Sequence, residues 1–485
     1  MMKLKELLHA IPVLQVIGPL EVEVDTIAFD SRQVQQGTLF VAVRGVHTDG
    51  HLFVGKAVEG KAVAVVVEEL PEHTDDAVTY VQVSDSAYAL GVLAANFYGN
   101  PSQELKLVGV TGTNGKTTVA TLLYNLFRQL GYHVGLLSTV ENRIGEKVVP
   151  ATHTTPDPVA LNKLMRQMVD DGCDYCFMEV SSHAIVQQRI VGLKFAGGIF
   201  TNITHDHLDF HKTFENYIKA KKKFFDDLDR YAFALTNVDD RNGNVMLQNT
   251  VAHRKTYGLH NMADFKAKVL ESHFDGMLLQ IDSHDLWVKL VGGFNAYNLL
   301  AVYSAAILLE QETSKVLVAL SEISGAEGRF ETVRSKNGVV GIVDYAHTPD
   351  AVENVLETIK NLRHEGQQII TVLGCGGDRD KTKRPEMANV ALKYSDKLII
   401  TSDNPRTEDP LQIIKDMEAG VPVEKKKNTF SIADRREAIR AACHLASPGD
   451  IVLVAGKGHE KYQEINGVRH HFDDREELEK TFNEQ

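Results

Sequence analysis

A glycine-rich segment near residue 110 has the residue types that hold a nucleoside triphosphate. An apolar run, Leu105–Thr111, leads into it and an amphipathic stretch follows. Glycines let backbone N–H groups point at phosphate oxygens, a lysine adds charge near the β- and γ-phosphates, and a hydroxyl at a helix start can bind Mg²⁺. A structural glycine turn would not explain Lys-Thr-Thr at the start of a helix. We therefore predict a phosphate loop comprising Gly112, Thr113, Asn114, Gly115, Lys116, Thr117 and Thr118, with Val110 where the general pattern has its first glycine.

A lysine lies on the apolar face of a predicted helix. In Thr213–Leu228 apolar residues recur at steps of three and four, which predicts a helix with a buried face of Phe214, Ile218, Lys221, Phe225 and Leu228. A buried ammonium ion is costly unless it is paired. Lys221 therefore has a carboxylate partner, reaches an edge of the helix, or carries a chemical change that removes its positive charge. The pattern alone does not choose among these three explanations.

Acidic and imidazole groups follow two predicted strands of the same region. Glu179 ends the strand Tyr175–Val180, and Asp206-His207-Leu208-Asp209 follows the strand Ile199–Ile203. A carboxylate and a histidine beside a triphosphate are suitable ligands for Mg²⁺, although Mg²⁺ prefers oxygen. Each residue alone is more often an ordinary polar residue at a strand end, so that interpretation stays open.

The elements that position these residues fall into three sections. Residues 1–101 alternate short β-like runs with glycine turns and predict a small N-terminal α/β domain. Residues 102–330 repeat strand, loop and helix, which predicts a parallel sheet covered by helices, and end with an antiparallel meander between Thr256 and Leu290. Residues 331–485 hold a second βα series, with strands predicted at Gly341–Tyr345, Gln368–Leu373, Lys397–Thr401 and Ile451–Ala455.

The composition excludes several classes of protein. The net charge of −13 over 485 residues argues against nucleic-acid binding, which relies on lysine and arginine. The longest strongly apolar run, Ala62–Val67, is too short to cross a membrane, so we expect a cytoplasmic protein without a membrane partner. Cys173 and Cys176 form a Cys-x-x-Cys without a second pair or a histidine cluster, and we interpret them as buried structural thiols. We expect a monomer with small-molecule substrates.

Several motifs, in order along nearly the whole chain, resemble those of the Mur ligases. They are the phosphate loop, Glu179-Val180-Ser181-Ser182-His183, Thr201-Asn202-Ile203 with Asp206-His207-Leu208-Asp209, Asp344-Tyr345-Ala346-His347-Thr348-Pro349, and Asp30-Ser31-Arg32 with Gly37–Ala42. The resemblance implies an α/β protein of three domains: a small N-terminal UDP-binding domain, a central phosphate-loop ATPase domain with a parallel sheet, and a C-terminal Rossmann-like domain for the incoming amino acid. It also implies an ATP-dependent acid–amino-acid ligase of peptidoglycan precursor synthesis.

The resemblance assigns roles to individual residues. Lys221 matches a lysine that CO₂ converts to a carbamate, which helps to hold the second of two Mg²⁺ ions, and Glu179 and His207 match other metal-binding positions. Thr117 is the hydroxyl that the phosphate loop offers to Mg²⁺. Lys116 stabilises the transferring phosphoryl group. Asn295, Arg329 and Asp344 resemble ATP contacts. The implied contacts to the UDP-muramoyl-dipeptide are Ser31, Thr154, Thr155, Ser181, Gln187 and Arg189, with His153 where related enzymes commonly have Asn.

Three polar clusters in the last section each follow a predicted strand and can converge on one ligand. They are Gly376-Gly377-Asp378-Arg379, Asp403-Asn404-Pro405-Arg406 and Gly456-Lys457-Gly458-His459-Glu460. Each cluster alone could be an ordinary connecting turn. The resemblance marks Asp403-Asn404-Pro405-Arg406 as the signature for meso-diaminopimelate instead of L-lysine. Arg379 and Arg406 can hold the distal carboxylate, and Glu460 can accept from the ammonium, with Gly456 in the same site. The alternatives are an L-lysine-adding Mur ligase, a folylpolyglutamate synthetase-like ligase, or a phosphate-loop regulatory ATPase.

Overall fold

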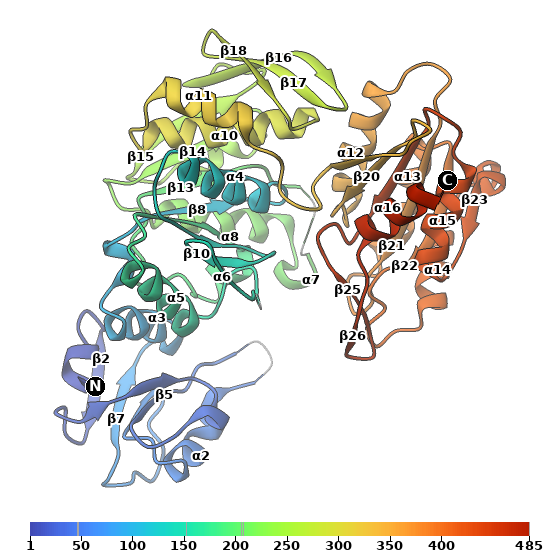
Figure 1. The fold of residues 1–485 in the computed structure, drawn as a ribbon. Helices are drawn as coiled ribbons and strands as arrows, with labels where there is room; N and C mark the ends of the chain where they lie inside the picture. The colour runs from blue at the N-terminus through green and yellow to red at the C-terminus, as the bar shows by residue number, and fades with distance from the viewer. Residues whose placement is uncertain (46–47, 152, 205, 207, 485) are drawn as a thin grey trace.

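The computed structural model describes residues 1–45, 48–151, 153–204, 206 and 208–484. Three bodies follow one another along the chain, each built on its own sheet, with the central body between the other two (Figure 1). In this described part, no helix combines the length and apolar character that a membrane crossing requires.

The N-terminal body contains a five-stranded sheet of order β2-β7-β6-β5-β4. Only the β2–β7 pair is antiparallel within it. The strands are β2 (Val13–Ile17), β4 (Thr26–Ala28), β5 (Thr38–Val41), β6 (Ala64–Val67) and β7 (Thr79–Val83), with β1 (Met2–Lys3) paired to β3 (Glu23–Val24) beside them. The helices are α1 (Leu4–Leu7), α2 (Val54–Glu59) and α3 (Ser86–Phe97). Every residue of β6 is buried, as expected for a parallel strand covered on both faces.

The central body is built on an eleven-stranded sheet of order β11-β10-β9-β12-β8-β13-β14-β15-β16-β17-β18. Its strands are β8 (Lys106–Thr111), β9 (Val134–Leu137), β10 (Asn142–Ile144), β11 (Lys147–Val149), β12 (Tyr175–Glu179), β13 (Gly197–Phe200), β14 (Phe233–Asn237), β15 (His253–Gly258), β16 (Phe265–His273), β17 (Gly276–Ile281) and β18 (His284–Val288). The strands from β9 to β16 in this order are parallel, and the predicted meander β16–β18 is antiparallel. The meander continues the same sheet at one edge.

Helices cover both faces of the central sheet. One apolar core lies under α4 (Lys116–Gln129), α10 (Gly293–Leu308) and α11 (Thr313–Glu322), and a second lies under α5 (Pro158–Asp170) and α8 (Phe214–Asp226). The short helices are α6 (Ser182–Val186), α7 (Leu208–His211) and α9 (Gly243–Met246). Thr213 caps the start of helix α8, and its hydroxyl accepts from the Asn216 amide. Lys221 is buried on α8 as predicted, but the buried face is rotated toward Tyr217 and Phe224, which leaves Phe214 and Ile218 half-buried.

The C-terminal body has a six-stranded sheet of order β19-β20-β24-β21-β22-β23, in which only β19 is antiparallel. Its strands are β19 (Glu331–Arg334), β20 (Val340–Asp344), β21 (Ile369–Cys375), β22 (Lys397–Ser402), β23 (Thr429–Ser431) and β24 (Ile451–Ala455), and a hairpin of β25 (Tyr462–Ile465) and β26 (Val468–His471) follows. The helices are α12 (Pro349–Leu362), α13 (Lys383–Tyr394), α14 (Pro410–Glu418), α15 (Arg435–Leu445) and α16 (Asp474–Glu484). One core packs α12–α14 against the sheet and another packs α15 and α16.

Candidate active site

The predicted phosphate loop joins β8 to α4 at the carboxyl edge of the central sheet. Gly115 precedes α4 at φ 86°, a left-handed conformation that favours glycine. At Gly112 a Cβ atom would lie 1.9 Å from Thr201 Oγ1, so a side chain has no space there. Lys116 Nζ donates to the backbone oxygens of Gly112 at 3.0 Å and Thr113 at 2.8 Å. Burial lowers the pKa of Lys116.

Two residues outside the loop fix its backbone. The Thr113 amide donates to the Asn202 carbonyl at 2.8 Å, and the Asn114 amide donates to Asn202 Oδ1 at 3.0 Å. The Thr113 hydroxyl is 3.1 Å from the Tyr217 hydroxyl. Thr117 and Thr118 lie buried in the first turn of α4. Neither Asn202 nor Tyr217 was predicted to contact the loop, because both are distant from it in sequence.

Lys221 lies directly beneath the phosphate loop. Its side chain is 1% exposed, and its Nζ donates to the Gly112 carbonyl at 2.7 Å and lies 4.7 Å from the Tyr217 ring centroid. Burial, with a contribution from the nearby Lys116 ammonium, places the pKa of Lys221 well below its ordinary value. Of the three explanations for a buried lysine, this environment favours the removal of its charge, because its described hydrogen-bond partner is a carbonyl and not a carboxylate.

Glu179 provides an unpaired acidic oxygen at the end of β12. The residue is 0% exposed, and its Oε1 accepts from the Thr139 amide at 2.7 Å. Its Oε2 is buried without a hydrogen-bond partner among the described residues. A buried carboxylate oxygen without a partner is costly, so this atom suits a cation. The predicted ligand His207 lies outside the described residues.

Four of the residues predicted to contact the dipeptide form a connected group beside Glu179. The Thr155 hydroxyl donates to the Glu179 carbonyl at 2.8 Å, and Arg189 Nη1 donates to the Thr155 carbonyl at 2.7 Å. Gln187 Oε1 accepts from Arg189 Nη2 at 2.6 Å. The Ser181 hydroxyl caps α6 and lies 3.5 Å from the Thr155 hydroxyl. The structure thus brings these side chains to the edge of the sheet that carries the phosphate loop.

The other two residues of the predicted dipeptide-binding set, Thr154 and Ser31, lie in different parts of the protein. Thr154 accepts at Oγ1 from the Thr139 hydroxyl at 3.0 Å, which connects it to the same strand edge, and the neighbouring His153 is exposed. Ser31 begins a short 3-10 helix (Ser31–Gln33) in the N-terminal body. No hydrogen bond within the described ranges joins Ser31 to the central group.

Two of the residues predicted to contact ATP lie near the start of α4: Arg329 contacts Thr117, and Asn295 contacts Asn298, which packs on Gly115. Asn295 lies in the first turn of α10, is 3% exposed and donates to the Val291 carbonyl at 2.8 Å. Arg329 Nη2 donates to the Thr117 hydroxyl at 3.3 Å, and its guanidinium lies 4.6 Å from the Tyr345 ring centroid. The link between the central and C-terminal bodies therefore contacts the phosphate loop through Arg329.

Asp344 ends β20 and shapes this link. Its Oδ2 accepts from the Phe330 amide at 2.7 Å, and its Oδ1 accepts from the Ala346 amide at 2.7 Å. Burial raises the pKa of the Asp344 carboxyl. This carboxylate fixes the backbone next to Arg329.

The polar loops of the C-terminal body meet around Asn404. Its Nδ2 donates to Glu460 Oε2 at 2.7 Å, and its Oδ1 accepts from Lys457 Nζ at 3.0 Å. Lys457, 0% exposed, was not predicted as a site residue although it lies inside a predicted cluster. Burial and the neighbouring Asp403 raise the pKa of Glu460. A Cβ atom at Gly456, φ 120°, would lie 2.7 Å from Asp403 Oδ2, so these loops are in close contact.

Arg406 connects two of the predicted clusters. Its Nη1 donates to the Gly377 carbonyl at 2.7 Å, and its amide donates to the Glu464 carbonyl of β25 at 3.0 Å. Gly377 packs on Pro405, since a Cβ atom at Gly377 would lie 1.9 Å from the Pro405 carbonyl oxygen. Arg379 is exposed on the same loop as Gly377. The three clusters therefore form one side of the C-terminal body, as expected from their strand ends.

This side of the C-terminal body faces the phosphate loop. Asn114 Nδ2 donates to Asp350 Oδ2 at 2.8 Å, across the two bodies. Lys383, the first residue of α13, forms an ion pair with Asp206. The phosphate loop and the polar loops of the C-terminal body thus border the same interface.

Comparison with known proteins identifies the family. Family models match residues 23–98 (Mur ligase family, catalytic domain), 110–306 (Mur ligase middle domain) and 328–458 (Mur ligase, glutamate ligase domain). A relative from Bacteroides fragilis is 58% identical, over 99% of this chain and 99% of its own. The chain belongs to the Mur ligase family.

Other Mur ligases extend the comparison. The Bacteroides fragilis relative carries the name UDP-N-acetylmuramoyl-L-alanyl-D-glutamate--2,6-diaminopimelate ligase, as does one from Clostridioides difficile that is 42% identical over 98% of both chains. A solved structure of a ligase with this name has a TM-score of 0.70 and 32% identity, covering 100% of this chain and 99% of its own. The MurF ligase from Thermotoga maritima in complex with ADP shares the fold, with a TM-score of 0.62, 20% identity and coverage of 96% and 97%.

Proposed function

We propose that this Mur ligase forms an amide bond between meso-diaminopimelate and the D-Glu carboxyl of UDP-N-acetylmuramoyl-L-Ala-D-Glu, at the expense of ATP. The name shared by relatives at 58% and 42% identity over nearly the whole chain supports the reaction. The observation that carries the proposal is the position of the phosphate loop, where Asn114 contacts Asp350 and Arg329 contacts Thr117. A triphosphate held there would have its terminal phosphate toward the interface where the two substrates can meet.

The proposed domain limits follow the three sheets. Residues 1–101 would bind the UDP-sugar through residues such as Ser31, residues 102–330 would bind ATP and the dipeptide, and residues 331–485 would bind the amino acid. The family models, which match residues 23–98, 110–306 and 328–458, are consistent with these limits.

The residues around Gly112 suit two Mg²⁺ ions. The buried Glu179 Oε2, which lacks a partner among the described residues, and the Thr117 hydroxyl are oxygen donors of the kind that Mg²⁺ prefers. His207 belongs to the same proposed set. Bound Mg²⁺ neutralises charge on the phosphates. The lowered pKa of Lys221 favours the neutral amine, which is the form that adds CO₂ and releases a proton to become a carbamate anion. We propose this carbamate as a further oxygen donor.

The reaction then follows from positioning and charge. The D-Glu carboxylate attacks the γ-phosphorus of ATP, the bond to the β-phosphate oxygen breaks, and an acyl phosphate and ADP form. The neutral amine of diaminopimelate attacks the acyl carbon, and phosphate leaves with formation of the amide. Lys116 would stabilise negative charge on the transferring phosphoryl group, and the group of Thr154, Thr155, Ser181, Gln187 and Arg189 would hold the dipeptide.

The C-terminal loops provide a rationale for the choice of amino acid. Diaminopimelate has a distal carboxylate and ammonium where lysine has only an ammonium. Arg406 and Arg379 can pair with the carboxylate, while Glu460, Asp403 and Asn404 can accept from the ammonium. A site built for polar groups can reject an analogue that lacks them by about 10⁴-fold. The carboxylate-binding arginines therefore favour diaminopimelate over L-lysine.

The test is a phosphate-release assay with the full chain, ATP and Mg²⁺. We expect phosphate only when UDP-muramoyl-dipeptide and meso-diaminopimelate are both present, with a product heavier by one diaminopimelate residue. Release of phosphate that is independent of the amino acid and gives no peptide product would instead support a regulatory ATPase.

A further inference from the structure

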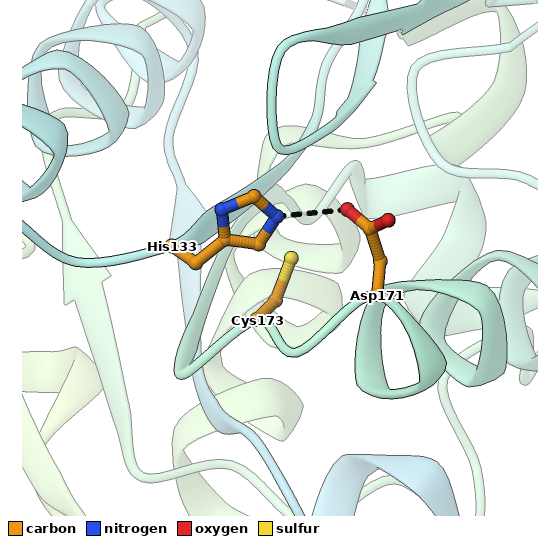
Figure 2. A group of neighbouring side chains, drawn as sticks. All are labelled: His133, Asp171 and Cys173. Atoms are coloured by element: carbon orange, nitrogen blue, oxygen red, sulfur yellow. Dashed lines mark hydrogen bonds and ion pairs between the residues drawn. The ribbon is translucent and has the colours of Figure 1, made fainter.

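Three metal-ligating side chains lie together at the amino end of the central sheet (Figure 2). His133 directly precedes β9, and Asp171 and Cys173 lie in the turn between α5 and β12. One ligand atom of each lies within 4.8 Å of the other two, and the His133 Nε2 and Asp171 Oδ2 atoms are 2.8 Å apart. Because β9 and β12 are neighbouring parallel strands, their starting residues meet although they are distant in sequence.

The backbone holds this group in place. The Asp174 amide donates to the His133 carbonyl at 2.9 Å, which ties the two strand starts together. The turn glycine Gly145, between β10 and β11, covers the group, since a Cβ atom there would lie 2.5 Å from His133 Nε2 and 3.3 Å from Asp171 Oδ2. The Gly145 amide donates to the Val134 carbonyl at 3.1 Å, which ties this turn to the start of β9. The three ligand residues thus come from two chain segments, and the turn at Gly145 packs on them.

We propose that His133, Asp171 and Cys173 bind a Zn²⁺ ion. Zn²⁺ accepts thiolate, imidazole and carboxylate ligands at about 2.0–2.3 Å, usually in tetrahedral geometry. The side chains of His133 and Asp171 are 44% and 52% exposed, so they can rotate toward an ion on their solvent side. Binding converts the Cys173 thiol to a thiolate and releases its proton, while the imidazole binds in its neutral form. Water can take the fourth position from the exposed side.

The ion would stabilise the fold and would not take part in the reaction. Cys173 precedes β12 and Glu179 ends it, so the five-residue strand separates the two sites by roughly 17 Å at about 3.3 Å per residue. An ion bound to the folded state alone raises the stability of the protein. We therefore expect Zn²⁺ to raise the melting temperature of the chain.

The test uses Co²⁺ as a spectroscopic probe of the full chain, after treatment with a chelator and a reductant and in excess Mg²⁺. We expect one equivalent of Co²⁺ to produce thiolate-to-cobalt charge-transfer absorption, which Zn²⁺ abolishes. Cys176→Ala should keep the band, because Cys176 is a neighbouring buried thiol outside the group. Cys173→Ala should remove it.

A second variant distinguishes loss of metal binding from misfolding of the protein. Asp171→Asn changes an exposed side chain and should weaken Co²⁺ binding by about tenfold or more, without changing the melting temperature of the metal-free chain. The proposal is overturned if the wild-type chain gives no thiolate band, if the band persists in Cys173→Ala, or if Asp171→Asn binds Co²⁺ as tightly as the wild type.

Discussion

Lys221 Nζ and the Gly112 carbonyl oxygen form a 2.7 Å hydrogen bond across 109 residues of sequence. The same carbonyl accepts from Lys116 at 3.0 Å, so the half-buried Lys116 and the buried Lys221 share one backbone oxygen of the phosphate loop. Two ammonium ions in this position would repel each other in a medium of low dielectric constant. A neutral Lys221 removes the repulsion, and a carbamate would turn it into attraction.

Replacement of Lys221 tests its proposed chemistry. We expect Lys221→Ala to lower kcat by about 100-fold or more, because an oxygen donor and an anion next to the loop are lost. Added formate or acetate should restore part of the activity by occupying the vacated space. Lys219→Ala, on the same helix with a side chain 66% exposed, should behave like the wild type. A Lys221→Ala enzyme that no short carboxylic acid can rescue would argue against a carbamate.

Lys457 is expected to organise the amino-acid site. Lys457→Met removes a buried ammonium that donates to Asn404 at 3.0 Å and lies 3.3 Å from Glu460 Oε2. Loss of one partner from a buried polar pair costs about 1–3 kcal/mol, so the KM for diaminopimelate should rise about tenfold or more while the KM for ATP changes little. The control is Lys461→Met, whose side chain is 54% exposed. Equal effects on the KM values for ATP and diaminopimelate would contradict this role.

Arg406 is expected to determine amino-acid selectivity. Arg406→Ala should raise the KM for meso-diaminopimelate by about 10–100-fold, because hydrogen bonds to a charged group contribute about 1.5–3 kcal/mol. The low kcat/KM expected for L-lysine should not change, because lysine has no distal carboxylate. The ratio of the two kcat/KM values reports the effect. Arg469→Ala is a matched control on the nearby hairpin, with a side chain 65% exposed. An unaltered ratio in Arg406→Ala would place carboxylate recognition elsewhere.

The lowered pKa of His459 predicts that the free energy of unfolding depends on pH. Burial, with the charge of Arg329, lowers the pKa of His459 to about 3. The unfolded chain binds this proton near pH 6.5, so from pH 6.5 down to pH 3 the unfolded state holds more protons and stability falls as the pH falls. The contribution is about 2 kcal/mol between pH 6.5 and pH 5.

The measurement is the drop in melting temperature between pH 7 and pH 5. It should be smaller in His459→Gln than in the wild type, whereas His444→Gln, at an exposed position of α15, should match the wild type. A drop of equal size in all three proteins would contradict the lowered pKa of the half-buried His459 imidazole.

The sequence patterns predicted most of the named strands because their physical signals are local, but the strand predicted at Ile199–Ile203 is β13 at Gly197–Phe200. The strand predicted at Ile451–Ala455 has the bounds of β24, and the helix predicted at Thr213–Leu228 is α8 with one residue fewer at its start and two fewer at its end. Burial of Lys221 followed from helical periodicity. The rotation of that face toward Tyr217 did not, because it depends on packing against the phosphate loop.

Contacts between distant segments account for what the sequence could not predict. Lys457 lies in a predicted cluster, but only the fold reveals that its ammonium points at Asn404 and Glu460. His133 comes to Cys173 through the pairing of β9 with β12, so the Cys-x-x-Cys spacing gave no sign of it. The pairing of Asn114 with Asp350 depends on how two bodies pack, which periodicity within either body does not encode.

A competition experiment tests the ligase assignment most directly. The full chain is incubated with ATP, Mg²⁺, UDP-N-acetylmuramoyl-L-Ala-D-Glu and equal concentrations of meso-diaminopimelate and L-lysine, and the products are resolved by mass spectrometry. We predict a tripeptide product that contains diaminopimelate almost exclusively, with one ADP formed for each amide bond. A mixed or lysine-containing product would contradict the proposed selectivity, and ADP without any tripeptide would contradict the ligase itself.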